Sequence, residues 1–325
     1  MVPSRPASRP GSKMVLLAAL VLLISLGGCS KSSPLGPPAG YTATEAARGG
    51  AAAASGFGSG SFYPLVVGNA WSYEGGGSFR LISGPGSYPD NYSYAFIESH
   101  RLIGTTHYEG TDYTVEEQVH HDVPEVYGPW TMWIPVRQNT QGLFSLDTFL
   151  QEPPVLDGNQ VAANGIKSGS PHLDLATFAA RHGKDASLER LVARIEKLRE
   201  LAHGVTRLER NLSTAAASET QLLGYPLRPG QTWGARSDIP WPVTVNRVEQ
   251  LATPAGRFQA WRLDINPGGS LVQEGEWVRV WYSRSGYLGY SIHTFTEGTD
   301  VNGDPTGNTY VADDSMMVTS VQVSR

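Results

Sequence analysis

The sequence predicts a mainly β protein, with two similar antiparallel β-rich halves that form a curved sheet or open barrel and an α-helical hairpin inserted between them. Three observations support this fold class. Short alternating runs broken by Gly, Pro, Asn and Asp begin at Phe62, as is typical of antiparallel strands. A nine-residue phrase occurs twice, and a helical pattern lies between its two copies.

Residues 1–28 have the pattern of a signal peptide, which is removed and takes no part in the fold. Three basic residues, Arg5, Arg9 and Lys13, precede the uncharged run MVLLAALVLLISL at 14–26. This run is too short for a membrane span, which needs about 20 helical residues to cross about 30 Å of hydrocarbon.

The four residues Leu26-Gly27-Gly28-Cys29 resemble the lipobox of bacterial lipoproteins, in which an apolar residue and two small residues precede a cysteine. The resemblance implies that Cys29 becomes the acylated first residue of the mature protein. The alternative is an ordinary secretory signal with a chance cysteine. Ser30 stands where an inner-membrane retention signal would have Asp. We therefore expect anchoring in the outer membrane, facing the periplasm or the cell surface.

Composition excludes several classes of function. Cys29 is the only cysteine, so the mature chain has no disulfide, no thiol nucleophile and no cysteine-based zinc site. Removing residues 1–28 removes three of the 25 basic residues and none of the 30 acidic ones, which leaves a formal charge of −8 (22 − 30). An acidic surface does not favour nucleic acid. We expect no cofactor.

Residues 29–60 are rich in Pro, Gly, Ala and Ser and lack apolar periodicity. This composition predicts a disordered tether, with an r.m.s. reach of about 30 Å. A lipid-anchored domain needs such a spacer to clear the headgroups.

Strand patterns fill a first β-rich half at 61–150 and a second at 221–325. In YTVEEQVHH, Glu116, Gln118 and His120 alternate with Tyr113 and Val115, so the two sets face opposite sides of a strand. Asn302-Gly303 is a strong hairpin signal.

Residues 151–220 interrupt this rhythm with a loop and two helical segments. A short helix is predicted over Asp174–His182. A longer one is predicted from Ser187 to Leu201, with a possible extension to Asn211. Its apolar residues form one narrow stripe: Leu188, Leu191, Ile195, Leu198, Ala202 and Val205. We expect the stripe to pack on the sheet of the same chain; the alternative is a partner-binding helix.

The repeated phrase is YPLVVGNAW at 63–71 and YPLRPGQTW at 225–233. The shared positions of interest are Tyr63, Pro64, Gly68 and Trp71 in the first copy, and Tyr225, Pro226, Gly230 and Trp233 in the second. A proline cannot donate to a β-ladder, a glycine permits a turn with positive φ, and a tryptophan anchors a core. The phrase therefore predicts the start of each β-rich half, and its repetition suggests an ancient duplication. The alternative is chance similarity.

Three segments, FYPLVVGNAWSYE, TPAGRFQAWRLDI and WYSRSGYLGY, together resemble a loose group of uncharacterised exported bacterial lipoproteins. The resemblance covers residues 62–150 and 222–295. It implies a β-rich fold, and no established activity comes with it. Where that group has Gly-x-Gly after the Trp-Tyr strand, this chain has Gly286 and Gly289. We therefore expect a hairpin of different length there.

No motif of nucleophilic, zinc-protease or phosphate-binding chemistry is present in the sequence. His120 and His121 are adjacent on a strand and point to opposite faces, so they cannot bind one ion together. We expect no histidine metal site. Asp300, Asn302 and Asp304 are a weak calcium candidate, because the sixth and twelfth loop positions lack the usual Gly and Glu.

We expect a non-enzymatic envelope protein that binds a partner protein or an apolar ligand. A first alternative is a carbohydrate-binding module in which Trp277, Arg279 and Trp281 line one strand face as a ligand platform. That face serves as core instead if the helical insert covers it. A second alternative is a glycan hydrolase that uses Glu274 and Glu276, which the alternation places on one strand face.

Overall fold

The computed structural model describes residues 62–83, 91–123, 129–146, 155–156, 159–160, 186–203, 219–234, 242–266, 274–300 and 302–324. The predicted signal peptide, Cys29, the tether and the predicted helix over Asp174–His182 lie outside the described residues. Within the described part of the chain, no helix is long and apolar enough to cross a membrane.

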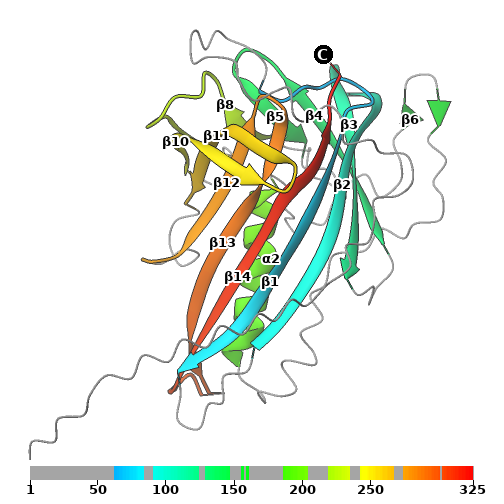
Figure 1. Ribbon diagram of the computed structural model, residues 1–325. Helices are drawn as coiled ribbons and strands as arrows, with labels where there is room; N and C mark the ends of the chain where they lie inside the picture. Colours follow the sequence, from blue (N-terminus) through cyan, green and yellow to red (C-terminus); the bar gives the residue numbers. More distant parts are fainter. Residues whose placement is uncertain are drawn as a thin grey trace, which may run out of the picture. The chain divides into compact units, whose positions relative to one another are not determined.

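The described residues form fourteen strands and one helix (Figure 1). In chain order these are β1 (Ala70–Ser83), β2 (Asn91–Tyr108), β3 (Thr111–Val123), β4 (Trp130–Gln138), β5 (Gly142–Leu146), β6 (Val155–Leu156), β7 (Asn159–Gln160), α2 (Ala186–Ala202), β8 (Glu219–Gly224), β9 (Thr232–Gly234), β10 (Pro242–Thr253), β11 (Gly256–Ile265), β12 (Trp277–Ser283), β13 (Gly286–Thr299) and β14 (Pro305–Gln322).

Twelve of the described strands form one antiparallel sheet, in the order β8-β5-β4-β3-β2-β1-β14-β13-β12-β11-β10-β9. The last strand in the chain, β14, pairs with the first, β1, so the first and last strands are neighbours in the middle of the sheet. The outermost strands β8 and β9 also contact each other, so the sheet is nearly closed and barrel-like. The predicted mainly β, antiparallel fold class is confirmed. β6 and β7 form a separate two-stranded ladder.

The sheet order divides into two runs of six strands. β1 to β5 followed by β8 make the first run, and β9 to β14 make the second. The tryptophan-containing strands β4 and β12 are each fourth in their run, and the aromatic strands β5 and β13 are each fifth. This order agrees with two similar halves, and their common origin stays a prediction.

The two copies of the repeated phrase adopt similar local structure. Gly68 and Gly230 each occupy a turn with positive φ, 96° and 84°, as their position in the phrase predicts. The amide of each glycine donates to a carbonyl in the second strand of its own run, at 2.8 Å and 2.7 Å. Trp71 and Trp233 then lie at the start of β1 and β9. Trp71 is fully buried and Trp233 is half-buried.

Helix α2 spans Ala186–Ala202, within one residue at each end of the predicted core segment. Figure 1 shows it running along β13 and β14, and its contacts are with β12, β13 and β14. Leu191, Ile195, Leu198 and Ala202 of the predicted stripe are buried in the main hydrophobic core. Packing on the sheet of the same chain is therefore confirmed. The other helix of the predicted hairpin, over Asp174–His182, lies outside the described residues.

Two predicted turn features are also observed. Asn302-Gly303 lies in the connection between β13 and β14, with Gly303 at φ 90°. Gly286 opens β13 after a turn, whereas Gly289 lies beside the register shift between Trp281 and Tyr282 at φ 133°. A Cβ at position 289 would overlap the carbonyl oxygen of Met316. Gly289 thus lies at a β-bulge that requires glycine, and a hairpin of different length from that of the resembling group stays a prediction.

Candidate functional site: a buried histidine–carboxylate cluster

Polar side chains line the inner face of β2 and β3. Glu98 and His100 alternate on β2, and Glu116, Gln118 and His120 alternate on β3; each is at most 4% exposed. The ladder places Glu98 opposite His120 and His100 opposite Gln118. Because side chains on a strand alternate between faces, this register brings all five to the inside of the sheet.

His100 lies between two carboxylates. Its Nε2 is 2.6 Å from Oε1 of Glu98, and its Nδ1 is 2.7 Å from Oε1 of Glu116. Glu116 is held in turn by the hydroxyl of Tyr63, which donates at 2.6 Å, and by the side-chain amide of Gln118, at 2.8 Å. The Tyr63 of the repeated phrase therefore fixes a carboxylate of this cluster.

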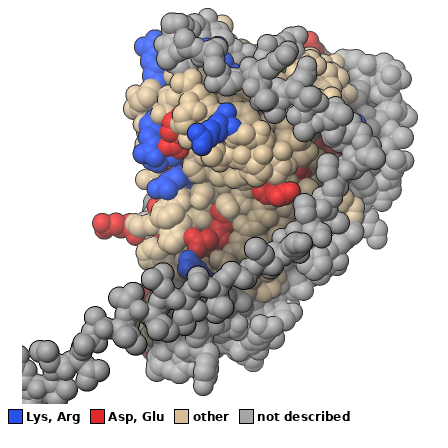
Figure 2. Space-filling model, in the orientation of Figure 1, with Lys and Arg blue, Asp and Glu red and all other residues tan. Residues whose placement is uncertain are grey.

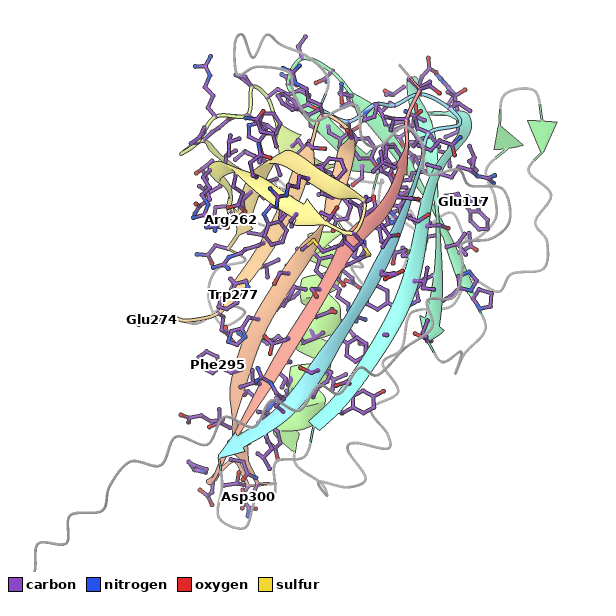
Figure 3. All side chains as sticks on the ribbon, viewed as in Figure 1. Glu117, Arg262, Glu274, Trp277, Phe295 and Asp300 are labelled. Atoms are coloured by element: carbon purple, nitrogen blue, oxygen red, sulfur yellow. The ribbon has the colours of Figure 1, made fainter. Side chains whose placement is uncertain are left out.

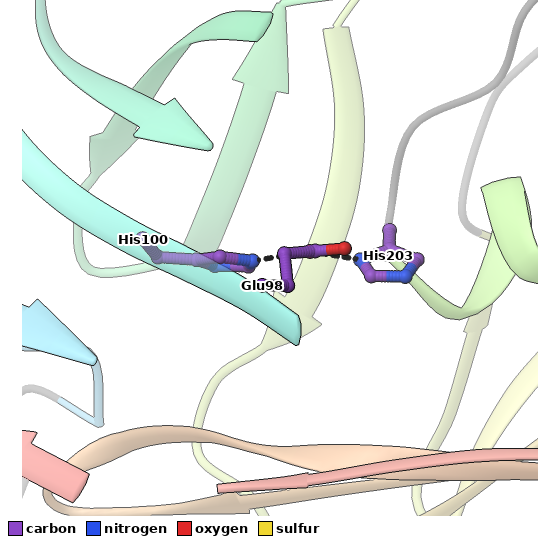
Figure 4. Close-up of side chains that lie close together, drawn as sticks. All are labelled: Glu98, His100 and His203. Carbon is purple, nitrogen blue, oxygen red and sulfur yellow. Dashed lines mark hydrogen bonds and ion pairs between the residues drawn. The ribbon is translucent and has the colours of Figure 1, made fainter. Parts of the chain in front are cut away.

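Two further histidines approach Glu98 from different directions. The Nδ1 of His120 is 3.1 Å from Oε2 of Glu98, and the Nδ1 of His203 is 3.5 Å from Oε1. His203 follows the last residue of α2, and its amide donates to the carbonyl of Arg199. Figure 4 shows Glu98 between His100, from β2, and His203, from the end of the helix.

The pKa values in the cluster shift strongly. Burial alone would raise the pKa of Glu98, but His203, His100 and His120 hold it well below its ordinary value. Burial alone would lower the pKa of His100, but Glu116 and Glu98 raise it to about 9. Burial lowers the pKa of His203. At neutral pH the cluster thus contains a cationic His100 between anionic carboxylates, beside a neutral His203.

Helix α2 forms two ion pairs, one with Asp314 of β14 and one with Glu276, which directly precedes β12. The guanidinium of Arg199 donates from Nε to Asp314, whose side chain is fully buried. Arg194 contacts Glu276 at 2.5 Å, and the hydroxyl of Thr294 donates to the same carboxylate. The helix is therefore held by charge as well as by the apolar packing expected from its stripe.

The expectation that Glu274 and Glu276 share a strand face is wrong. Both residues precede β12 and belong to a turn region. Glu274 is exposed, and Figure 3 shows it at the outer edge of the protein. Glu276 has a fully buried side chain that pairs with Arg194. The two carboxyl groups do not face a common cleft, because a turn rather than a regular strand carries them.

The predicted ligand platform lies on the outer face of β12, opposite the face that α2 covers. The ring of Trp277 stacks on His293, with centroids 4.4 Å apart, and the guanidinium carbon of Arg279 is 4.3 Å from the Trp277 centroid. Trp281 is only 7% exposed, and its indole N–H donates to Glu249 at 2.7 Å. The two indoles therefore do not form an exposed pair.

The weak calcium candidate is a turn in which two backbone amides donate to one carboxylate oxygen, Oδ1 of Asp300. The carboxylate of Asp300 accepts hydrogen bonds from the backbone amides of Asn302, at 2.8 Å, and Asp304, at 2.9 Å. These bonds lower the pKa of Asp300. An Asn-Gly turn accounts for this arrangement.

Sequence reasoning did not identify the buried cluster. It placed Glu116, Gln118 and His120 on one face of a strand, and it correctly separated His120 from the exposed His121. The sequence also places Glu98 and His100 at alternate positions of the preceding strand. This pattern was the signal that could have indicated a shared polar face with Glu116, Gln118 and His120. His203 could not be added from the sequence, because only tertiary packing brings the end of α2 to β2.

We predict that Asp314→Asn lowers the free energy of unfolding by about 3–5 kcal/mol, because it leaves the buried Arg199 without a counter-charge. Chemical denaturation monitored by circular dichroism measures this change. The adjacent Asp313→Asn is the matched control: Asp313 is 38% exposed and pairs with the partly exposed Arg80, so its loss costs about 1 kcal/mol or less. Equal losses for the two variants would contradict the assignment.

We predict that stability falls as the pH rises from about 6.5 through 9, because the pKa of His100 is about 9 in the folded chain and about 6.5 when unfolded. Because the pKa of His100 is higher in the folded state, its protonation stabilises the fold. This contribution of about 3 kcal/mol is fully present below pH 6.5, the unfolded pKa, and is lost as the pH rises through 9, the folded pKa. Urea denaturation across this pH range in EDTA-containing buffer measures the change. His100→Gln should reduce the slope without abolishing it, because the pKa of His120 is also raised, by Asp122 and Glu98. The exposed His107→Gln should retain the full slope; an unchanged slope in His100→Gln contradicts the assignment.

No known family model matches the chain, and no curated protein matches it. Among solved structures, the fold is similar to that of a predicted lipoprotein from Parabacteroides distasonis, with a TM-score of 0.30, 10% identity, and coverage of 80% of this chain and 98% of that one. It is also similar to a predicted exported protein from Bacteroides fragilis with a YmcC-like fold, with a TM-score of 0.34, 9% identity, and coverage of 81% and 99%. At these values the likeness assigns no function.

Proposed function

We propose that the protein is a lipid-anchored envelope protein that acts by binding a partner protein and performs no chemistry of its own. The resemblance of residues 26–29 to a lipobox supports acylation at Cys29, and Ser30 supports an outer-membrane location. Multiple acyl chains make such an anchor stable, at about 0.8 kcal/mol per buried CH₂.

The observation that carries the binding proposal is Arg279 on the outer face. Partial burial and the neighbouring Arg262 and Arg247 lower the pKa of this guanidinium. Glu249 pairs with Arg247, and Asp264 pairs with Arg262. Among the described residues no carboxylate forms an ion pair with Arg279, and its buried Nε has no hydrogen-bond partner. A carboxylate from outside the chain would supply the missing counter-charge.

The surface around Arg279 is locally basic on an acidic protein. Figure 2 shows Lys and Arg side chains gathered along the edge where Figure 3 shows Arg262. Trp277 lies beside them and adds apolar area that aromatic residues commonly contribute to protein interfaces. Charge complementarity therefore favours a partner protein that presents an acidic segment.

The other ligand classes fit less well. α2 packs on the inner face of the sheet, where an apolar ligand of an open barrel would lie. Trp281 is buried, and the ring of Trp277 already stacks on His293 and Arg279. Neither indole offers the open ring face on which a sugar would stack.

The anchor is tested by metabolic labelling with an alkyne analogue of palmitate. We expect the unsubstituted chain to incorporate the label and Cys29→Ser to incorporate none, because Cys29 is the only thiol. Labelling of Cys29→Ser at the same level, or no labelling of the unsubstituted chain, would contradict lipidation at this residue.

The partner is tested by placing a photo-cross-linking amino acid at Ser291, which pairs with Arg279 across the ladder. We expect a discrete cross-linked protein in the living bacterium, which disappears when Arg279→Glu reverses the charge. The same amino acid at the exposed Ser99 on β2 is the matched control and should give no such product.

Cross-links that are identical at both positions, or that survive Arg279→Glu, would contradict the proposal. A saturable change in tryptophan fluorescence on titration with oligosaccharides or fatty acids would also contradict it, since either result assigns a non-protein ligand.

A further inference from the structure

Three potential metal ligands converge where the end of α2 meets β2. Glu98, His100 and His203 each offer one ligand atom, and these atoms all lie within 4.8 Å of one another. Tetrahedral zinc bonds of about 2.0–2.2 Å place neighbouring ligand atoms about 3.3–3.5 Å apart. The 3.5 Å between Nδ1 of His203 and Oε1 of Glu98 already has this spacing. The 2.6 Å between Nε2 of His100 and Glu98 would need to open by about 0.7 Å.

The surroundings of His100 match those of a metal-binding imidazole. Histidine ligands almost always donate their second ring N–H to a carboxylate or carbonyl, which fixes the ring and its tautomer. Here the Nδ1 of His100 forms an ion pair with Glu116 at 2.7 Å, without the alignment of a hydrogen bond, and Tyr63 and Gln118 hold that carboxylate in place. The opposite ring atom, Nε2, is thereby aimed at Glu98.

His203 supplies an imidazole nitrogen that, among the described residues, contacts only Glu98 at ion-pair distance. Its Nδ1 is buried and has no hydrogen-bond partner among the described residues. A buried polar atom without a hydrogen-bond partner destabilises the folded state. A metal bond at Nδ1 would remove this destabilisation.

The ligand types select a class of ion. Two imidazole nitrogens and one carboxylate suit zinc and its neighbours in the first transition series, whereas calcium and magnesium prefer sites made of oxygen alone. We propose that Glu98, His100 and His203 bind one divalent transition-metal ion of the zinc class, which ties the end of α2 to β2.

Binding is a ligand exchange that leaves the folded chain otherwise intact. The ion takes the place of the proton between Nε2 of His100 and Glu98, so one proton is released for each ion bound. Glu116 keeps its contact with Nδ1 of His100. The site lies on the inner face of the sheet, whereas partner binding is proposed on the outer face of β12. The metal-binding proposal can therefore hold or fail independently of the proposed function.

The test is calorimetric titration of the full chain in detergent micelles, stripped with EDTA, with Zn²⁺. We expect one ion per chain, and no displacement by excess Mg²⁺. Glu116→Gln should weaken binding by about 10–100-fold through the orientation of His100. His203→Ala should weaken it at least as much. His121→Ala is the matched control, an exposed histidine next to His120, and should bind as tightly as the unsubstituted chain.

X-ray absorption at the zinc edge of the unsubstituted chain provides a test that needs no variant. We expect a shell of nitrogen and oxygen at about 2.0–2.1 Å with the scattering pattern of two imidazoles. No saturable binding, equal affinities in His203→Ala and His121→Ala, or a sulfur shell at about 2.3 Å from unacylated Cys29 would each overturn the proposal.

Discussion

The rest of the structure depends on two buried ion pairs that hold α2 against the sheet, Arg199–Asp314 and Arg194–Glu276, which we call the charged seam. Arg199 pairs with the fully buried Asp314, and Arg194 pairs with the fully buried Glu276. Each carboxylate would be strongly destabilised without its cation. A shift of the helix by one turn would move both cations by about 5.4 Å and break both pairs. We infer that these pairs, more than the apolar stripe, select the one position of α2 on the sheet.

This seam decides what each face of the sheet can do. Because α2 is fixed, His203 at its end contacts Glu98 of β2. Glu98 also pairs with His100, so the end of the helix joins the buried cluster of β2 and β3. The inner face is therefore filled by the protein's own helix and by paired polar groups. Among the described residues no carboxylate pairs with Arg279, and we propose the outer face of β12 as the surface that binds a partner. Partner binding on the outer face and metal-ion binding on the inner face are separate proposals about opposite faces of one sheet.

Much of the fold was predictable because it follows from local patterns. Alternation gave the faces of β12, and the helical stripe gave α2 to within a residue. The turn glycines of the two phrases have the positive φ that their positions require. The buried cluster was not predictable from the sequence. It depends on the register that places Glu98 opposite His120, and on packing that brings in His203, 105 positions after Glu98 (203 − 98). The prediction that Glu274 and Glu276 share a strand face was wrong for a related reason. Alternation of side chains assumes a regular strand, and these residues lie in a turn before β12.

The most direct test of the central claim is native-state hydrogen exchange of the amides of α2 compared with those of β13 and β14. If the charged seam makes helix and sheet one cooperative unit, the protected α2 amides should exchange with the same free energy as the slowest amides of these strands. In Asp314→Asn, the α2 amides should lose protection before the strands do. Rapid exchange of α2 in the unsubstituted chain, with the strands still protected, would contradict the account.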